Sequence, residues 1–299
     1  MSIETESFAA IHEKYSKAIG WMVKIGVKLG TNRLDHYDKV VRAWKENYKT
    51  ASVQEGKAVF PDFVSSVVEI RDFIDVYSAF EGIPKERLNA VISKLNKGVN
   101  GPTNAIDERP KNTQARNYLF EAATAARLHR PGSGVEAILD AESDTAARIG
   151  VKKVWIECKR VTTTDRIEDN FRKATKQLEA ILKKKVGAAN RAMVALDISK
   201  ILNEGDKILA KDTEAELLSS VDWLMDQFIR QYHQTWEKVY RRRDKKIIGT
   251  LIRFSFMSSV EDRKLLVHTS QWGVNPRLGV SAADGSLQKE LCVKMKQSP

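Results

Sequence analysis

An alternating run of side chains in the middle of the chain constrains the fold most. Residues 154–159 read VWIECK, so that Glu157 and Lys159 are separated by a single residue within an otherwise apolar run. A period of two is typical of an extended strand, whose successive side chains point to opposite faces. Glu157 and Lys159 therefore lie on the same face of the predicted strand.

An acidic residue is expected to join this pair from a neighbouring strand. The apolar run 135–139 (VEAIL) favours a strand, and the turn-like segment 142–150 (ESDTAARIG) separates it from the next one. A hairpin of this kind would bring Asp144 to the end of the sheet where Glu157 and Lys159 project. Two carboxylates and one ammonium group are then predicted to converge.

This grouping suits metal-assisted cleavage of a phosphodiester. Carboxylate oxygens are good ligands for Mg²⁺, and the ion supplies a Lewis acid and a bound water of lowered pKa. The ammonium group of Lys159 can orient that water or stabilise charge on the phosphate. Because the pKa of a free lysine is about 10.4, the residue is a poor general base at neutral pH. We therefore assign Lys159 to electrostatics and water positioning.

An acidic residue two positions before a lysine is not a specific signal by itself, because it occurs four times. Only the Glu157 copy ends an alternating apolar strand, follows an acidic residue 13 positions earlier and precedes a long amphipathic helix pattern at 165–185. This context identifies the Glu157/Lys159 copy as the candidate site. The four copies are Glu55/Lys57, Glu157/Lys159, Asp244/Lys246 and Asp262/Lys264.

The order of these residues resembles the PD-(D/E)xK nuclease superfamily, whose members share the restriction-endonuclease-like fold. The resemblance covers roughly residues 115–200 and includes a helix with Glu121 before Asp144. It implies that Asp144, Glu157 and the backbone carbonyl of Cys158 bind Mg²⁺ or Mn²⁺. It also implies that Lys159 positions the attacking water and that Glu121 supports the metal shell.

The chain departs from the superfamily pattern in three ways. Serine, in place of proline, precedes Asp144, and Ile181 stands four residues after Gln177, where one branch has an aromatic residue. Asp140 and Glu142 compete with Asp144 for the role of first metal ligand.

Composition and charge narrow the class of protein. The net charge is +11. Residues 1–110 contain 16 Lys and Arg and 15 Asp and Glu, so residues 111–299 contain 34 Lys and Arg and 24 Asp and Glu. The positive charge thus lies with the candidate site, as a nucleic-acid substrate requires, although solubility alone would also explain it. With two cysteines, no signal-peptide pattern and no long apolar run, we expect a cytoplasmic chain without a membrane partner. A homodimer is left open.

The predicted fold is α/β. Apolar residues at helical spacing predict a helical N-terminal region at 1–110, and the Gly-, Pro- and Asn-rich segment 98–114 marks its end. Residues 111–299 are predicted to form a restriction-endonuclease-like core, with a central mixed sheet flanked by helices. After helix 165–185, the run MVALDIS at 193–199 predicts a buried strand, which a right-handed crossover would join to the strand at 154–158 if the two are parallel.

Basic residues near the site are predicted to bind nucleic acid. The polar face of helix 165–185 is basic, and we expect Lys173, Lys176 and Gln177 to contact the substrate together with Arg160. A further helix is predicted at 212–243, and its basic end YRRRDKK is either a solvated helix terminus or a phosphate-contacting patch. Two strands are predicted on either side of the turn SSVEDRK, as an antiparallel pair that extends the sheet, and the segment after residue 276 is expected to be partly irregular.

These observations predict a Mg²⁺-dependent nuclease with a preference for DNA over RNA and endonucleolytic action. One alternative is a non-catalytic basic module that binds nucleic acid on the same fold. Another is a helical partner-binding protein in which the motif is incidental.

Overall fold

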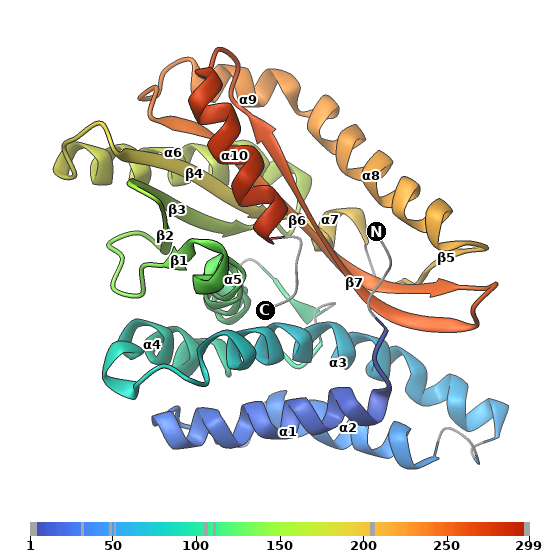
Figure 1. Cartoon of the computed structure of the whole chain (residues 1–299). Helices are drawn as coiled ribbons and strands as arrows, with labels where there is room; N and C mark the ends of the chain where they lie inside the picture. Colours follow the sequence, from blue (N-terminus) through green and yellow to red (C-terminus); the bar gives the residue numbers. More distant parts are fainter. Residues whose placement is uncertain are drawn as a thin grey trace.

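Helices and one mixed β-sheet make up the chain in a computed structural model that describes residues 5–30, 33–47, 50, 52–104, 107–109, 112–203 and 207–295. The α/β class is confirmed. Figure 1 shows the sheet with helices against both faces and a layer of N-terminal helices beneath it.

The N-terminal region is helical, as predicted. Its helices are α1 (Phe8–Ile25), α2 (Arg33–Asn47), α3 (Val53–Phe80) and α4 (Asn89–Gly98). The side chains of Ser7 and Ser52 cap the starts of α1 and α3, and α1 ends at Gly26, whose φ of 97° suits glycine. The core of this region is aromatic and includes Tyr15, Tyr37, Phe63, Phe73 and Phe80.

The first strands form a meander rather than the predicted hairpin. Helix α5 (Gln114–Leu128) leads into β1 (Val135–Ala137), β2 (Thr145–Ile149) and β3 (Lys152–Arg160), with each strand antiparallel to the next. The segment read as a turn thus contains β2. Of the five residues of β2, only Arg148 is exposed, so the strand is buried on both faces and lacks the alternation that would have revealed it.

The remaining strands extend the sheet beyond β3. Helix α6 (Ile167–Lys184) connects β3 to β4 (Asn190–Asp197), the predicted strand, which is parallel to β3. The sheet then continues through β6 (Ile247–Val260) to β5 (Leu209–Lys211), and β7 (Leu265–Pro276) pairs with β6 in the predicted antiparallel arrangement. The short helix α7 (Ser199–Leu202) follows β4.

One C-terminal prediction needs correction, and another holds only in part. The long helix expected at 212–243 is divided at Tyr232 into α8 (Glu214–Gln231) and α9 (His233–Tyr240). The segment expected to be partly irregular contains α10 (Ala282–Met295). Leu287, Leu291 and Met295 recur every four residues along α10 and bury one side of it against the sheet.

Helix α5 lies between the sheet and the N-terminal helices. Its Leu119, Ala122 and Ala126 pack into the helical core, whereas Phe120 and Leu128 pack with α10 against the sheet. Helices α6, α8 and α9 cover the opposite face of the sheet. Among the described residues, no helix has the length and apolar character needed to cross a membrane. The boundary between 1–110 and 111–299 stays a prediction.

Candidate active site

The sequence-predicted trio lies together at the end of β3. The Nζ atom of Lys159 is 3.2 Å from Oδ2 of Asp144 and 3.2 Å from Oε2 of Glu157. The same Oδ2 atom accepts a hydrogen bond of 2.8 Å from the backbone N–H of Cys158. Asp144 therefore contacts both the backbone and the lysine of the strand that carries Glu157.

The strand pairing explains this arrangement. Strand β2 begins at Thr145, which pairs with Ile156, so β3 has no β2 partner beyond that pair. The N–H groups of Lys153 and Val161 donate to the β4 side, and the N–H of Cys158 points the other way, towards Asp144. Because N–H and C=O of one residue in a strand face the same side, the carbonyl of Cys158 also faces Asp144.

Burial and charge shift the protonation of Glu157. Its side chain is 4% exposed. Burial, with the nearby charge of Asp144, raises the pKa of Glu157 to about 8, and Lys159 only partly opposes this. Burial alone would lower the pKa of Lys159, but the carboxylates of Asp144 and Glu157 outweigh it and raise the pKa. Lys159 is therefore an ammonium ion at neutral pH.

Glu121 reaches the site from α5. It is paired there with a lysine that was not predicted from the sequence. Lys94 of α4 forms an ion pair with Oε2 of Glu121 and donates a hydrogen bond of 2.5 Å to the backbone carbonyl of Asp144. Burial and the charge of Asp144 raise the pKa of Glu121. A signal was present, because Lys94 lies between Val91 and Gly98 on the buried face of α4, where a charge needs a partner.

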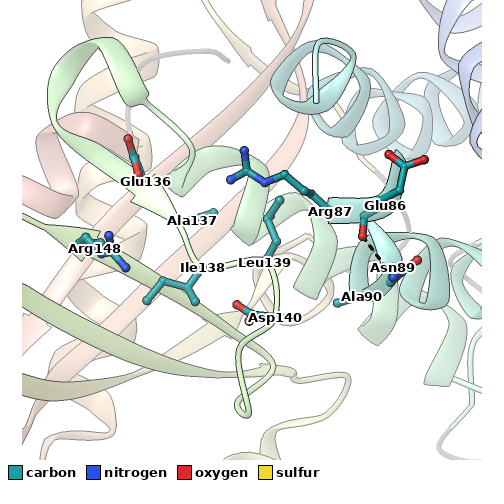
Figure 2. Close-up of a pocket in the computed structure, with 10 residues that line it drawn as sticks. All are labelled: Glu86, Arg87, Asn89, Ala90, Glu136, Ala137, Ile138, Leu139, Asp140 and Arg148. Atoms are coloured by element: carbon teal, nitrogen blue, oxygen red, sulfur yellow. Dashed lines mark hydrogen bonds between the residues drawn. The ribbon is translucent and has the colours of Figure 1, made fainter. Parts of the chain in front are cut away.

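The competing acids Asp140 and Glu142 point elsewhere. Asp140 is exposed and lines a separate pocket of about 550 Å³ between the start of α4 and β1, into which Arg87 projects (Figure 2). Glu142 forms a surface ion pair of 2.5 Å with Lys185. In the described contacts, Asp144 is the acid of this loop that meets Glu157 and Lys159.

The predicted nucleic-acid contacts fall into two groups. Lys173, Lys176 and Gln177 are exposed on α6. Arg160 is turned inward, where its guanidinium pairs with Glu108 and lies 3.6 Å from Asp197. Its contact with nucleic acid stays a prediction and would require this buried network to open. Glu108 is also buried.

The rival copies of the motif have ordinary local roles. Glu55 forms the capping box at the start of α3. Asp244 accepts a hydrogen bond from the N–H of Lys246, and Asp262 is exposed in the turn between β6 and β7. The backbone N–H of Asp244 donates to Glu179, but no described contact joins the side-chain carboxylate of any of the three to a second carboxylate.

The oxygen atoms of the site suit a hard cation with several waters. Within the described ranges, no group of three or more His, Cys, Asp and Glu side chains is arranged to hold a metal ion. Two carboxylates and one backbone carbonyl do converge here, and Mg²⁺ is usually bound through one or two carboxylates while it keeps several waters. The donor set therefore fits Mg²⁺ and lacks the nitrogen and sulfur ligands typical of zinc.

Comparison of the chain with protein-family models, with curated proteins and with solved structures gives no match. The interpretation of the site therefore rests on its own residues.

Proposed function

We propose that the chain is a Mg²⁺- or Mn²⁺-dependent nuclease that hydrolyses phosphodiester bonds, with DNA as the preferred substrate and endonucleolytic action. The observation that carries this proposal is the position of Lys159, whose Nζ is equidistant from Asp144 and Glu157. Two carboxylates and one ammonium at a strand end suit phosphodiester hydrolysis, which needs placement and charge stabilisation.

The order of elements supports the same proposal. Helix α5, the meander β1–β2–β3, helix α6 and strand β4 follow one another along the chain, and the strands adjoin in the order β1–β2–β3–β4–β6. A mixed sheet built in this order around the candidate site is similar to the core expected of a PD-(D/E)xK nuclease.

Asp144, Glu157 and the Cys158 carbonyl would hold the metal ion. When bound, Mg²⁺ supplies a Lewis acid and a water of lowered pKa. The hydrogen bond from Cys158 N–H to Asp144 fixes the carboxylate for this role. Burial, with the nearby charge of Asp144, raises the pKa of Glu157 despite Lys159, and a further cation at the site would stabilise the ionised carboxylate.

Lys159 would act as a donor. Its raised pKa keeps the ammonium protonated, so it can donate a hydrogen bond to a water or to a non-bridging phosphate oxygen. Its side chain is 20% exposed, so an incoming phosphate can reach it. Burial on the remaining sides strengthens its effect on charge that develops in the transition state.

Lys173 and Lys176 would contribute affinity without sequence preference. Both are exposed on α6, the helix that follows the catalytic strand. Contacts of this kind neutralise backbone phosphates and release counterions.

A non-catalytic nucleic-acid-binding module is the second candidate. Lys159 and Lys94 already place two ammonium groups against the carboxylates of Asp144, Glu157 and Glu121. A site so nearly neutral can be stable without a metal ion. In that case the basic surface would bind nucleic acid without cleaving it.

Incubation of the purified chain with supercoiled plasmid DNA tests the proposal. We expect nicked and linear products with Mg²⁺ or Mn²⁺ and none with EDTA. Salt-sensitive binding without metal-dependent products would favour the second candidate, and absence of both would refute the two together.

A further inference from the structure

Three basic segments meet at the opposite end of β3 from the candidate site. We call residues 150–153, 183–189 and 241–246 the basic pole. Lys152 Nζ donates to the carbonyl of Ala188 at 3.2 Å, which joins the first segment to the second. Lys246 Nζ donates to the carbonyl of Gly187 at 3.2 Å, which joins the third segment to the second.

The charge of the basic pole is almost entirely positive. Its three segments contain ten Lys and Arg and one acid, Asp244. Lys185 and Arg243 pair with Glu142 and Glu179 outside these segments. The side chains of six cations form no hydrogen bond or ion pair within the part of the chain that the structure describes, although Lys184 acts electrostatically on Glu142. These six are Lys153, Lys183, Lys184, Arg241, Arg242 and Lys245.

Unpaired like charges at this density repel one another and disfavour the folded chain unless a polyanion binds them. Figure 1 shows the loop after α6 and the segment between α9 and β6 on the side of the molecule away from α1 and α2.

Helix α6 links the pole to the candidate site. It starts just after β3 ends and returns to the pole, and Lys173, Lys176 and Lys184 lie within one face at helical spacing. From Lys153 to Cys158 the strand covers about 15–20 Å at roughly 3.3 Å per residue. That length corresponds to about five or six base pairs of duplex at 3.4 Å each.

We propose that the basic pole is a second nucleic-acid contact, which binds the phosphate backbone of a DNA duplex beyond the cleavage position. The choice of DNA as the polyanion rests on the proposed function. The substrate would then lie along the exposed face of α6, held at its far end by the six unpaired cations.

An anionic membrane is the competing partner. Val151 and Val186 are 84% and 86% exposed and lie in the loops of the pole, so they could enter a lipid surface beside the lysines. Two valines provide little apolar area for insertion into a lipid surface. The basic face of α6, which continues towards the candidate carboxylates, favours a linear polyanion instead.

Binding of a labelled duplex in EDTA tests the proposal without cleavage. The duplex should be about 24 base pairs, longer than the roughly six that the strand spans. We compare the full chain with two variants, Lys153→Ala/Lys183→Ala/Lys184→Ala and Arg241→Ala/Arg242→Ala/Lys245→Ala. The matched control, Lys24→Ala/Lys28→Ala/Lys57→Ala, removes three exposed lysines of the N-terminal region.

Each pole variant should bind the duplex about tenfold more weakly and reduce the slope of log affinity against log salt by about two to three units. The control should bind like the wild type. Melting temperatures equal to or above that of the wild type would show that the variants are folded. Pole variants that bind like the control, or a wild type that binds phosphatidylserine vesicles but not the duplex, would overturn the proposal.

Failure of the pole and failure of the proposed nuclease can be told apart. If the wild type cleaves plasmid with Mg²⁺ but the pole variants bind normally, only the second contact is wrong. If the pole variants lose affinity for the duplex but the wild type does not cleave plasmid, the basic pole is a nucleic-acid contact and the proposed nuclease activity is wrong.

Discussion

Lys94 donates a 2.5 Å hydrogen bond to the backbone carbonyl of Asp144, 50 residues further along the chain. Through this contact a helix of the N-terminal region holds the loop that carries the first candidate carboxylate. The same ammonium pairs with Glu121 of α5. The N-terminal helices are thus a structural part of the candidate site.

Lys94→Ala should therefore impair both stability and cleavage. It leaves the buried carboxylate of Glu121 and the carbonyl of Asp144 without a donor, at a cost on the order of 1–3 kcal/mol in the free energy of unfolding. We expect plasmid cleavage to fall about 10- to 100-fold, because small displacements of catalytic groups are costly. Initial rates and thermal unfolding measure the two effects.

The control for this prediction is Lys97→Ala. Lys97 lies on the same helix but is exposed, with its Nζ 4.6 Å from the centre of the Tyr118 ring. Equal behaviour of the two variants in rate and stability would show that Lys94 has no special role.

The parts of the site that were predictable from sequence are those with a local pattern. The alternation around Glu157 and Lys159 fixed their common face, and helix α6 followed from its apolar stripe. Strand β2 was missed because burial of both its faces removes alternation. Lys94 was missed because its partners are distant in sequence and only the packing of α4 on α5 brings them together.

Glu157→Gln should stabilise the metal-free protein at high pH. The pKa of Glu157 is about 8 in the folded chain against an ordinary value of 4.5. The contribution of this group to stability is therefore complete below pH 4.5 and is lost as pH rises through 8. Since glutamine stays neutral, the variant should exceed the wild type by on the order of 2 kcal/mol at pH 9.

Chemical denaturation in EDTA at several pH values measures this difference. Glu142→Gln is the matched control, because Glu142 is exposed and its surface partner Lys185 lowers its pKa. A gain for Glu157→Gln that does not change with pH would refute the carboxylate interaction.

Lys173→Ala/Lys176→Ala should weaken DNA binding for all sequences. Both residues are exposed on α6, so their removal should flatten the salt slope by about one to two units. Anisotropy titrations with two unrelated duplexes measure this, with Lys24→Ala/Lys28→Ala as the control. An unchanged slope would exclude this face from the interface.

A fragment of residues 111–299 should aggregate. Removal of the N-terminal helices exposes Leu119, Ala122 and Ala126 of α5. It also removes Asp72 and Asp75, which form ion pairs with the buried Arg253 and Arg127, and the loss of one partner of a buried ion pair is costly. Light scattering and thermal unfolding of the fragment test this, and a monomer that melts cooperatively would contradict it.

The central claim is that Asp144, Glu157 and Lys159 form one metal-dependent site. Asp144→Ala and Glu157→Ala each remove an oxygen ligand, so both should lose Mg²⁺ affinity together with cleavage. Asp140→Ala and Asp262→Ala remove acids that lie outside the site and should cleave at nearly the wild-type rate.

Plasmid cleavage by Lys159→Ala at saturating Mg²⁺ is the most direct test. The variant removes the ammonium that lies 3.2 Å from both carboxylates, so Mg²⁺ should bind at least as tightly in a calorimetric titration. Cleavage should nevertheless fall by about three orders of magnitude, because charge stabilisation in the transition state is lost. A Lys159→Ala variant that binds Mg²⁺ and cleaves plasmid at the wild-type rate would contradict the account.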